Sequence, residues 1–198
     1  MKTNSLLHIQ DLGRIDYQKA WDYQQKLSAE LIETKLWNRH NPTEARPIQH
    51  YLLFCEHPHV YTLPRKGDAN NLLISEAEMQ ALGAHLVINN RGGQVTYHGQ
   101  GQLVVYFVLD LEDIFTDVNK YIRGLEEMII NVLKNYHIAA GRIPSLSGVW
   151  LNPDTPQARK ICAIGIHLSR WVSTHGIAFN IHTDLSYFEQ YYSLRDNG

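Results

Sequence analysis

The sequence of 198 residues has two cysteines and no long apolar run. Cys55 and Cys162 do not belong to a CxxC pair, and two cysteines are too few for a disulfide framework. A stretch of about 18 consecutive apolar residues, which a membrane-spanning helix requires, is missing. The first 17 residues lack the apolar segment and small-residue cleavage site of a signal peptide. We therefore expect a cytoplasmic protein, outside any membrane, whose two thiols are reduced.

An excess of either charge is also missing. The chain has 18 Lys and Arg against 20 Asp and Glu, with a net charge of −2, and no basic stripe that would indicate nucleic-acid binding. The 11 histidines are scattered without the spacing of metal ligands, so we expect no metal site.

Helical and strand patterns alternate without a regular βαβ repeat. This mixture predicts an α+β fold, with a mixed or antiparallel sheet and flanking helices, and the length fits one domain over residues 1–198. Apolar spacing predicts helices over residues 16–36 and 119–136, and a short helix after a capping box at Ser75 and Glu78 that Gly83 ends. The expected strands are 48–57, 85–90, 102–111, part of 137–151, and a hairpin of 160–169 and 171–182. Residues 58–71 are expected to be a loop or an irregular strand.

The segment "RGGQVTYHGQGQLVVYFVLDL", residues 91–111, is the most unusual in the chain. Gly92 and Gly93 allow the backbone to turn or to approach a ligand closely. Arg91 is suited to brace this loop or to pair with an anion, and His98 to donate a hydrogen bond or to move a proton. Taken alone, the glycine pair is most simply a turn. The segment does not match the G-x-x-x-x-G-K-[ST] pattern of a phosphate-binding loop.

The longer string "RGGQVTYHGQGQLVVY" resembles the signature of the lipoyl(octanoyl) transferases, the lipoate-protein ligase B family. That signature has proline where this chain has Gln100. The segments "EHPHVYTL", "KICAIGIHLSRWVSTHGIAFNI" and "DLSYF" match the family in the same order, so the resemblance covers most of the chain.

The resemblance implies a fold related to the catalytic domains of biotin and lipoate ligases. It also implies transfer of an octanoyl group, without a bound cofactor, from acyl carrier protein to a lysine of a lipoyl domain. The implied acceptors are the lipoyl domains of 2-oxoacid dehydrogenases and the H protein of the glycine cleavage system.

The resemblance further assigns three stretches to the acyl site. Its substrate-binding residues are Arg91, Gly92, Gly93, Gln94, Val95, Thr96, Tyr97, His98, Ala163, Ile164, Gly165, Gly176, Ile177 and Ala178. We expect an apolar groove lined by Gly92, Gly93, Tyr97, His98, Ile164, Gly165 and Ala178. Small residues on neighbouring strands leave room for an eight-carbon chain, and burial of each methylene contributes about 0.8 kcal/mol. We expect Gly93→Leu to weaken acyl binding more than folding.

Members of the family use a cysteine nucleophile and a lysine that lowers its pKa. Lys160 matches the lysine. The Pro-Cys-Gly segment of the nucleophile is missing, and Leu194 stands at its expected position. We interpret this ending as a truncation, a frameshift or a true divergence. Cys162 lies two residues after Lys160, which on a regular strand places both side chains on one face, although a small buried apolar residue is the simpler interpretation.

Two other functions remain open. One is an ATP-dependent ligase for lipoate or biotin, which shares the fold but requires an adenylate site. The other is a non-catalytic module that binds an acyl group or its carrier protein, which the missing nucleophile favours.

Overall fold

A computed structural model describes residues 5–190 of the chain. Its helices are α1 (Tyr17–His40), α2 (Glu76–Ala81) and α3 (Val118–Asn135), with 3-10 segments η1 (Pro42–Glu44), η2 (Ala69–Asn71), η3 (Leu111–Asp113) and η4 (Leu185–Gln190). Its strands are β1 (Ser5–Arg14), β2 (Ile48–Glu56), β3 (Val60–Pro64), β4 (His85–Asn89), β5 (Thr96–His98), β6 (Gln102–Val108), β7 (Ala140–Ile143), β8 (Leu146–Leu151), β9 (Arg159–Ser169) and β10 (Val172–Asn180).

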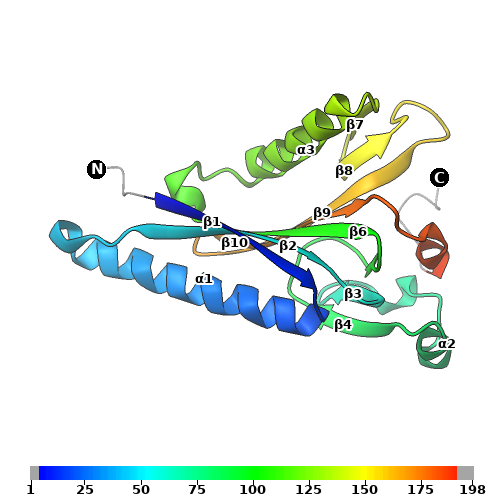
Figure 1. Cartoon of the computed structure of the whole chain (residues 1–198), viewed down its shortest axis with the longest axis horizontal. Coiled ribbons are helices and arrows are strands. Elements are labelled where there is room, and N and C mark those ends of the chain that lie inside the picture. The colour runs from blue at the N-terminus through cyan, green and yellow to red at the C-terminus, as the bar shows by residue number, and fades with distance from the viewer. Residues whose placement is uncertain (1–4, 191–198) are drawn as a thin grey trace.

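Within residues 5–190 the larger sheet has seven strands in the order β1-β2-β6-β10-β9-β8-β7. Strands β1 and β2 are parallel, and the other neighbours are antiparallel. Helix α1 lies along one face of this sheet and α3 along the other (Figure 1). The predicted α+β class, with a mixed sheet and flanking helices, is confirmed. None of the described helices is long and apolar enough to cross a membrane.

Each face of the sheet carries its own apolar core. On the α1 side, Leu27 and Leu31 pack with Val104 and Ala178 from the sheet. On the α3 side, helix residues pack against the opposite face of the same strands; this cluster contains Val105, Phe107, Leu111, Tyr121, Leu125, Ile129, Leu133, Val149, Cys162 and Ile177. Alternate residues of β6 therefore serve different cores, which explains why its sequence is apolar without alternation.

A second, three-stranded sheet has the order β4-β3-β5. All of β3 is buried, and it runs parallel to β4 and antiparallel to β5. Residues 58–71 therefore contain a regular strand at 60–64, where the sequence predicted a loop or an irregular strand. Pro58 precedes this strand and Pro64 is its last residue, so the sequence pattern resembles a loop and hides the regular pairing.

Local sequence signals set the ends of the helices. The side chain of Asp16 accepts a hydrogen bond from the Lys19 N–H at 3.1 Å, which caps α1 at its first turn. The predicted capping box of α2 is confirmed, because Ser75 and Glu78 bond reciprocally to each other's backbone. Gly83 follows α2 with φ +66°, as a residue that ends a helix commonly does.

A buried carboxylate joins α3 to the edge of the larger sheet. Glu126 is fully buried and accepts hydrogen bonds from Arg123 at 2.7 Å, Arg142 at 2.9 Å and the Gly148 N–H at 3.0 Å. Its removal leaves a buried backbone donor and two guanidinium groups without their shared acceptor.

We expect Glu126→Leu to lower the free energy of unfolding by about 3 kcal/mol, because one partner of a buried charged network is lost. Glu127→Ala is the matched control: this exposed carboxylate also contacts Arg142, at 2.6 Å, and an exposed pair contributes less than about 1 kcal/mol. Urea denaturation of both variants measures the difference. Equal effects of the two substitutions would contradict the assigned role.

Candidate active site

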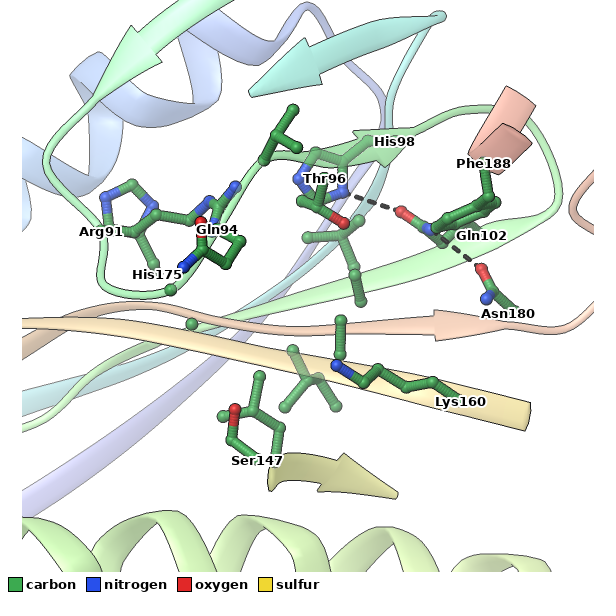
Figure 2. A pocket seen from close by; sticks show the side chains of 18 of the residues that line it. Arg91, Gln94, Thr96, His98, Gln102, Ser147, Lys160, His175, Asn180 and Phe188 are labelled. Atoms are coloured by element: carbon green, nitrogen blue, oxygen red, sulfur yellow. Dashed lines mark hydrogen bonds between the residues drawn. The ribbon is translucent and has the colours of Figure 1, made fainter. Parts of the chain in front are cut away.

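A cavity of about 770 Å³ lies between the hairpin of β9 and β10 and the segment that leads into β5 (Figure 2). Its volume falls within the range of about 300–1,000 Å³ typical of sites for small molecules. Residues of both sheets line it, and Tyr17 at the start of α1 and Leu185 and Phe188 of η4 complete the wall.

The hairpin contributes four small residues to this wall. Ala163 pairs with Ala178, and Gly165 pairs with Gly176, in alternate positions of the β9–β10 ladder. A Cβ atom added at Gly176 would lie 2.2 Å from the carbonyl oxygen of Val105, so this position tolerates no side chain. The four small residues keep the space above the hairpin open; we call them the small-residue floor.

Arg91 braces the loop on the opposite side of the cavity. Its guanidinium donates to the Thr62 carbonyl at 2.8 Å, to the Thr62 hydroxyl at 2.9 Å and to the Gly92 carbonyl at 3.1 Å. Gly93 has φ +96°, a conformation that favours glycine. The bracing role that the sequence offered for Arg91 therefore holds in the structure, where the side chain lies in the cavity wall.

Most of the residues that the resemblance assigned to the acyl site meet at this cavity, together with Lys160, which it assigned to catalysis. Those in its wall are Arg91, Gly93, Gln94, Val95, Thr96, His98, Lys160, Ala163, Ile164, Gly165, Gly176, Ile177 and Ala178. Residues more than 60 positions apart in the sequence thus surround one space.

Two residues expected in the groove lie elsewhere. The N–H of Gly92 donates to the Ile166 carbonyl at 2.9 Å, so this glycine docks the loop onto β9. Tyr97 faces away from the cavity, because side chains alternate along β5 and those of Thr96 and His98 take the cavity side. Its ring stacks on Tyr187 with centroids 4.6 Å apart, inside the core of the smaller sheet.

Lys160 and Cys162 do not share a face of β9, contrary to the prediction from their spacing. The pairing with β8 shifts register between Cys162 and Lys160, because Val149 pairs with Cys162 whereas Trp150 pairs with Lys160. This bulge interrupts the alternation of side chains. Lys160 consequently lines the cavity, with Nζ 4.7 Å from the centre of the Trp150 ring, whereas Cys162 packs in the core on the α3 side.

Both cysteines are unsuited to act as nucleophiles. Cys162 is fully buried, and burial raises the pKa of its thiol well above the ordinary value against the opposing effect of Lys160. Burial also raises the pKa of Cys55 to about 12. Neither side chain reaches the cavity wall, and a thiol at a raised pKa is a poor nucleophile. Leu194, the expected position of the nucleophile, lies outside the described residues.

The sequence did not single out several polar residues of the wall, namely Tyr17, Gln102, Tyr106, His175 and Asn180. Gln102 and Asn180 are joined by a hydrogen bond of 2.9 Å across neighbouring strands. These residues come from α1, β6 and β10, and without the strand order nothing in the chain indicates that they meet. The final glutamine of "HGQGQ" was visible as part of the motif but carried no separate signal.

His175 has a strained backbone with φ +59° directly before Gly176. Its ring Nε2 bonds to Asn90 Oδ1 at 2.8 Å, and its N–H donates to the Gln24 side chain at 2.8 Å. Burial, reinforced by the nearby charge of Arg91, lowers the pKa of His175 to about 3. The imidazole is therefore neutral at pH 7 and adds no charge to the cavity.

Metal-ion chemistry has no evident ligand set here. Across residues 5–190, no group of three or more His, Cys, Asp or Glu side chains is arranged to hold a metal ion. The polar groups of the cavity are mostly neutral, with Arg91, Arg159 and Lys160 as its cationic members and Glu189 as its acidic one.

Comparison with known proteins defines the class to which this fold and cavity belong. The sequence matches the family described as the lipoyl protein ligase A/B catalytic domain over residues 16–197, and the chain belongs to this family. It is 50% identical over 186 residues to an octanoyltransferase of Christiangramia forsetii, covering 94% of this chain and 79% of the relative. It is 51% identical over 189 residues to an octanoyltransferase of Cytophaga hutchinsonii, covering 94% and 78%.

Two solved structures that share the fold are described as ligases. A bipartite lipoate protein ligase from Thermoplasma acidophilum, described with its E2 lipoyl domain, superposes with a TM-score of 0.66 at 18% identity, covering 98% of this chain and 68% of that one. A lipoate-protein ligase A bound with ATP gives a TM-score of 0.57 at 17% identity, covering 100% and 78%. At these identities the likeness establishes the fold alone.

Proposed function

We propose that the chain is an octanoyltransferase of lipoate biosynthesis, which moves an octanoyl group onto a lysine of a lipoyl domain. The donor is octanoyl-acyl carrier protein. The acceptors are lipoyl domains of 2-oxoacid dehydrogenases and the H protein of the glycine cleavage system, and the reaction takes place in the cytoplasm. Residues 1–198 act as one catalytic domain.

The observation that carries this proposal is the small-residue floor beneath a cavity of about 770 Å³. An octanoyl chain offers only apolar methylene and methyl groups, each worth about 0.8 kcal/mol when buried. The chain lies over Ala163 and Ala178, and its thioester carbonyl lies toward Lys160. Arg91 and residues 93–98, except Tyr97, form the facing wall.

Transfer requires that the acyl group be held while water is kept out. The bracing of Arg91 on Thr62 fixes the loop without placing its charge at the acyl chain. Lys160 is exposed at the opposite side of the cavity, where its ammonium group stabilises negative charge on a sulfur atom or on the carbonyl oxygen. Positioning of this kind contributes even when no covalent intermediate forms.

A calorimetric titration with an octanoyl-pantetheine thioester tests the proposal. We expect one binding site per chain and negligible affinity for pantetheine without the acyl group, because the methylenes supply the binding energy. Equal affinity for the two compounds would contradict an acyl site.

An ATP-dependent ligase is the second candidate, since the solved neighbours are ligases and one of them is bound with ATP. Incubation with octanoate or lipoate and ATP separates the two functions. We expect no acyl-adenylate, and ATP-dependent acylation of a lipoyl domain would favour the ligase.

The burial of both cysteines favours a third candidate, a module that binds the acyl group without turnover. Binding of the acyl group without any transfer to a lipoyl domain would support this candidate.

A further inference from the structure

A glutamine in the wall of the cavity holds His98 in one orientation. The side chain of Gln102, which is 2% exposed, places Oε1 2.8 Å from His98 Nδ1. Its amide nitrogen donates to the Tyr97 carbonyl at 3.2 Å and to the Asn180 side chain at 2.9 Å. Figure 2 shows His98, Gln102 and Asn180 as one row along the wall.

This row determines which ring nitrogen of His98 carries hydrogen. A backbone carbonyl accepts hydrogen bonds and cannot donate them, so the Gln102 atom that faces Tyr97 is the NH₂ group. The amide oxygen of Gln102 therefore faces His98 Nδ1, and an amide oxygen also only accepts. It follows that His98 Nδ1 bears the hydrogen and donates it to Gln102.

The other nitrogen of His98 then carries a lone pair. Burial, with added repulsion from His57 and Arg91, holds the pKa of His98 well below its ordinary value, so the ring is neutral. Its ring also stacks on the uncharged Tyr17 with centroids 5.7 Å apart. A neutral imidazole protonated at Nδ1 has a bare Nε2, which is a hydrogen-bond acceptor and a base.

His98 lines the cavity, and its bond to Gln102 leaves Nε2 as the ring nitrogen available to a ligand. Among the described residues it forms no hydrogen bond, yet it is not one of the fully enclosed side-chain atoms that lack a partner. The same nitrogen is occupied in the two neighbouring histidines: His57 Nε2 accepts from the Tyr106 hydroxyl at 2.6 Å, and His175 Nε2 bonds to Asn90 at 2.8 Å.

We propose that His98 Nε2 accepts a hydrogen bond from the attacking lysine amine of the acceptor domain, and that Gln102 and Asn180 are positioning residues that hold His98 in this tautomer. The inference rests on the proposed function, which brings such an amine into the cavity. An acyl chain has no donor for Nε2, and a thioester carbonyl has none either, whereas an amine has two N–H bonds.

The step is balanced without any further reactant. The amine nitrogen attacks the carbonyl carbon of the thioester, a C–N bond forms, and the C–S bond breaks with its electron pair on sulfur. The proton that the nitrogen loses passes to His98 Nε2 and then to the leaving thiolate. His98 ends neutral, with hydrogen on Nδ1 as before.

Histidine ¹⁵N resonances test the tautomer without any turnover. In long-range ¹H–¹⁵N spectra at pH 7, we expect His98, assigned by its loss in His98→Asn, to show a protonated Nδ1 and a bare Nε2. Gln102→Leu should convert it to a mixture of tautomers. Asn180→Ala leaves the bond from Gln102 to the Tyr97 carbonyl intact and should produce a partial mixture of tautomers. This variant provides the test if Gln102→Leu does not fold. A resonance of protonated Nε2 in the unmodified protein, or an unchanged tautomer in both variants, would overturn the positioning role.

Thr174→Val is the matched control for these variants. Thr174 is 2% exposed, lies on β10 like Asn180, and its hydroxyl has no hydrogen-bond partner among the described residues. Its substitution should therefore leave the His98 resonances unchanged. Movement of those resonances in this control would show that any change in the buried polar groups alters the tautomer.

A second measurement tests contact with the amine. A lipoyl domain is added to the protein with a bound octanoyl-pantetheine amide, which cannot be cleaved as a thioester can. We expect the His98 Nε2 resonance to shift with the intact domain and to stay unchanged with a domain whose target lysine is replaced by methionine. Binding of the intact domain without a shift of Nε2 overturns this inference alone. Absence of any binding refutes the proposed function together with the acceptor role, while the tautomer result stands separately.

Discussion

Replacement of Ala163 by tryptophan is expected to weaken octanoyl binding by about 100-fold or more. The Ala163 side chain lies in the floor beside its partner Ala178, and it is half-buried, so a larger side chain grows into the cavity. If the indole displaces about four methylenes of the ligand, about 3 kcal/mol of burial is lost, and every 1.4 kcal/mol corresponds to a tenfold change in affinity.

Folding should change less than binding in this variant, because Ala163 lines the cavity as well as packing against the core on the α1 side. Ala163→Ser, which keeps the volume nearly constant, is the control and should bind within a few-fold of the unmodified protein. Affinity for octanoyl-pantetheine is measured by calorimetry, and stability by urea denaturation. Retained affinity in a folded Ala163→Trp protein would show that the acyl chain binds elsewhere.

The substitution Gly93→Leu is a less selective probe than the sequence suggested. Gly93 adopts φ +96°, which strains any side chain regardless of the available space. A loss of binding in Gly93→Leu would therefore combine a filled cavity with a distorted loop. Ala163 separates the two effects, since no positive φ occurs at this position.

The chain of 198 residues is expected to form no acyl-enzyme on either cysteine, and to transfer octanoyl groups more slowly than a family member with its nucleophile by about a thousandfold or more. Cys55 and Cys162 are buried at 3% and 0% exposure, and burial raises the pKa of both thiols. Removal of the nucleophile from a group of residues that act together commonly costs several orders of magnitude. Transfer is then limited to direct attack by the acceptor amine on the bound thioester.

Intact mass spectrometry of the protein after exposure to octanoyl-acyl carrier protein measures this directly. We expect no added octanoyl mass, and Cys162→Ser should leave any residual transfer to a lipoyl domain unchanged. A thiol reagent should modify both cysteines only after denaturation. An acyl group trapped on Cys162, with loss of transfer in Cys162→Ser, would show that the bulge of β9 rearranges to present this thiol.

Local patterns predicted much of the fold. The apolar spacing of α3, the capping box at Ser75 and the hairpin of β9 and β10 each depend on neighbours within a few residues of the chain. Strand β1 was missed because it lies at the edge of the sheet, where Leu6, Leu7 and Ile9 are all exposed and give no alternation.

Only the parts of the candidate site that belong to the family motif could be predicted from the sequence. The motif named the loop from Arg91 to His98 and the hairpin residues, yet it did not show that Tyr97 turns toward the smaller core. The register shift that separates Lys160 from Cys162 depends on how β9 pairs with β8. The spacing of two residues between Lys160 and Cys162 does not reveal this pairing. Asn180 and Gln102 meet across strands 78 positions apart, so their bond depends on the topology of the larger sheet.

A crystal structure of the protein with an octanoyl-pantetheine amide tests the central claim most directly. The account predicts an acyl chain that lies over Ala163 and Ala178, with its carbonyl group toward Lys160. An acyl chain bound outside this cavity, or a cavity that stays empty although calorimetry detects binding, would contradict it.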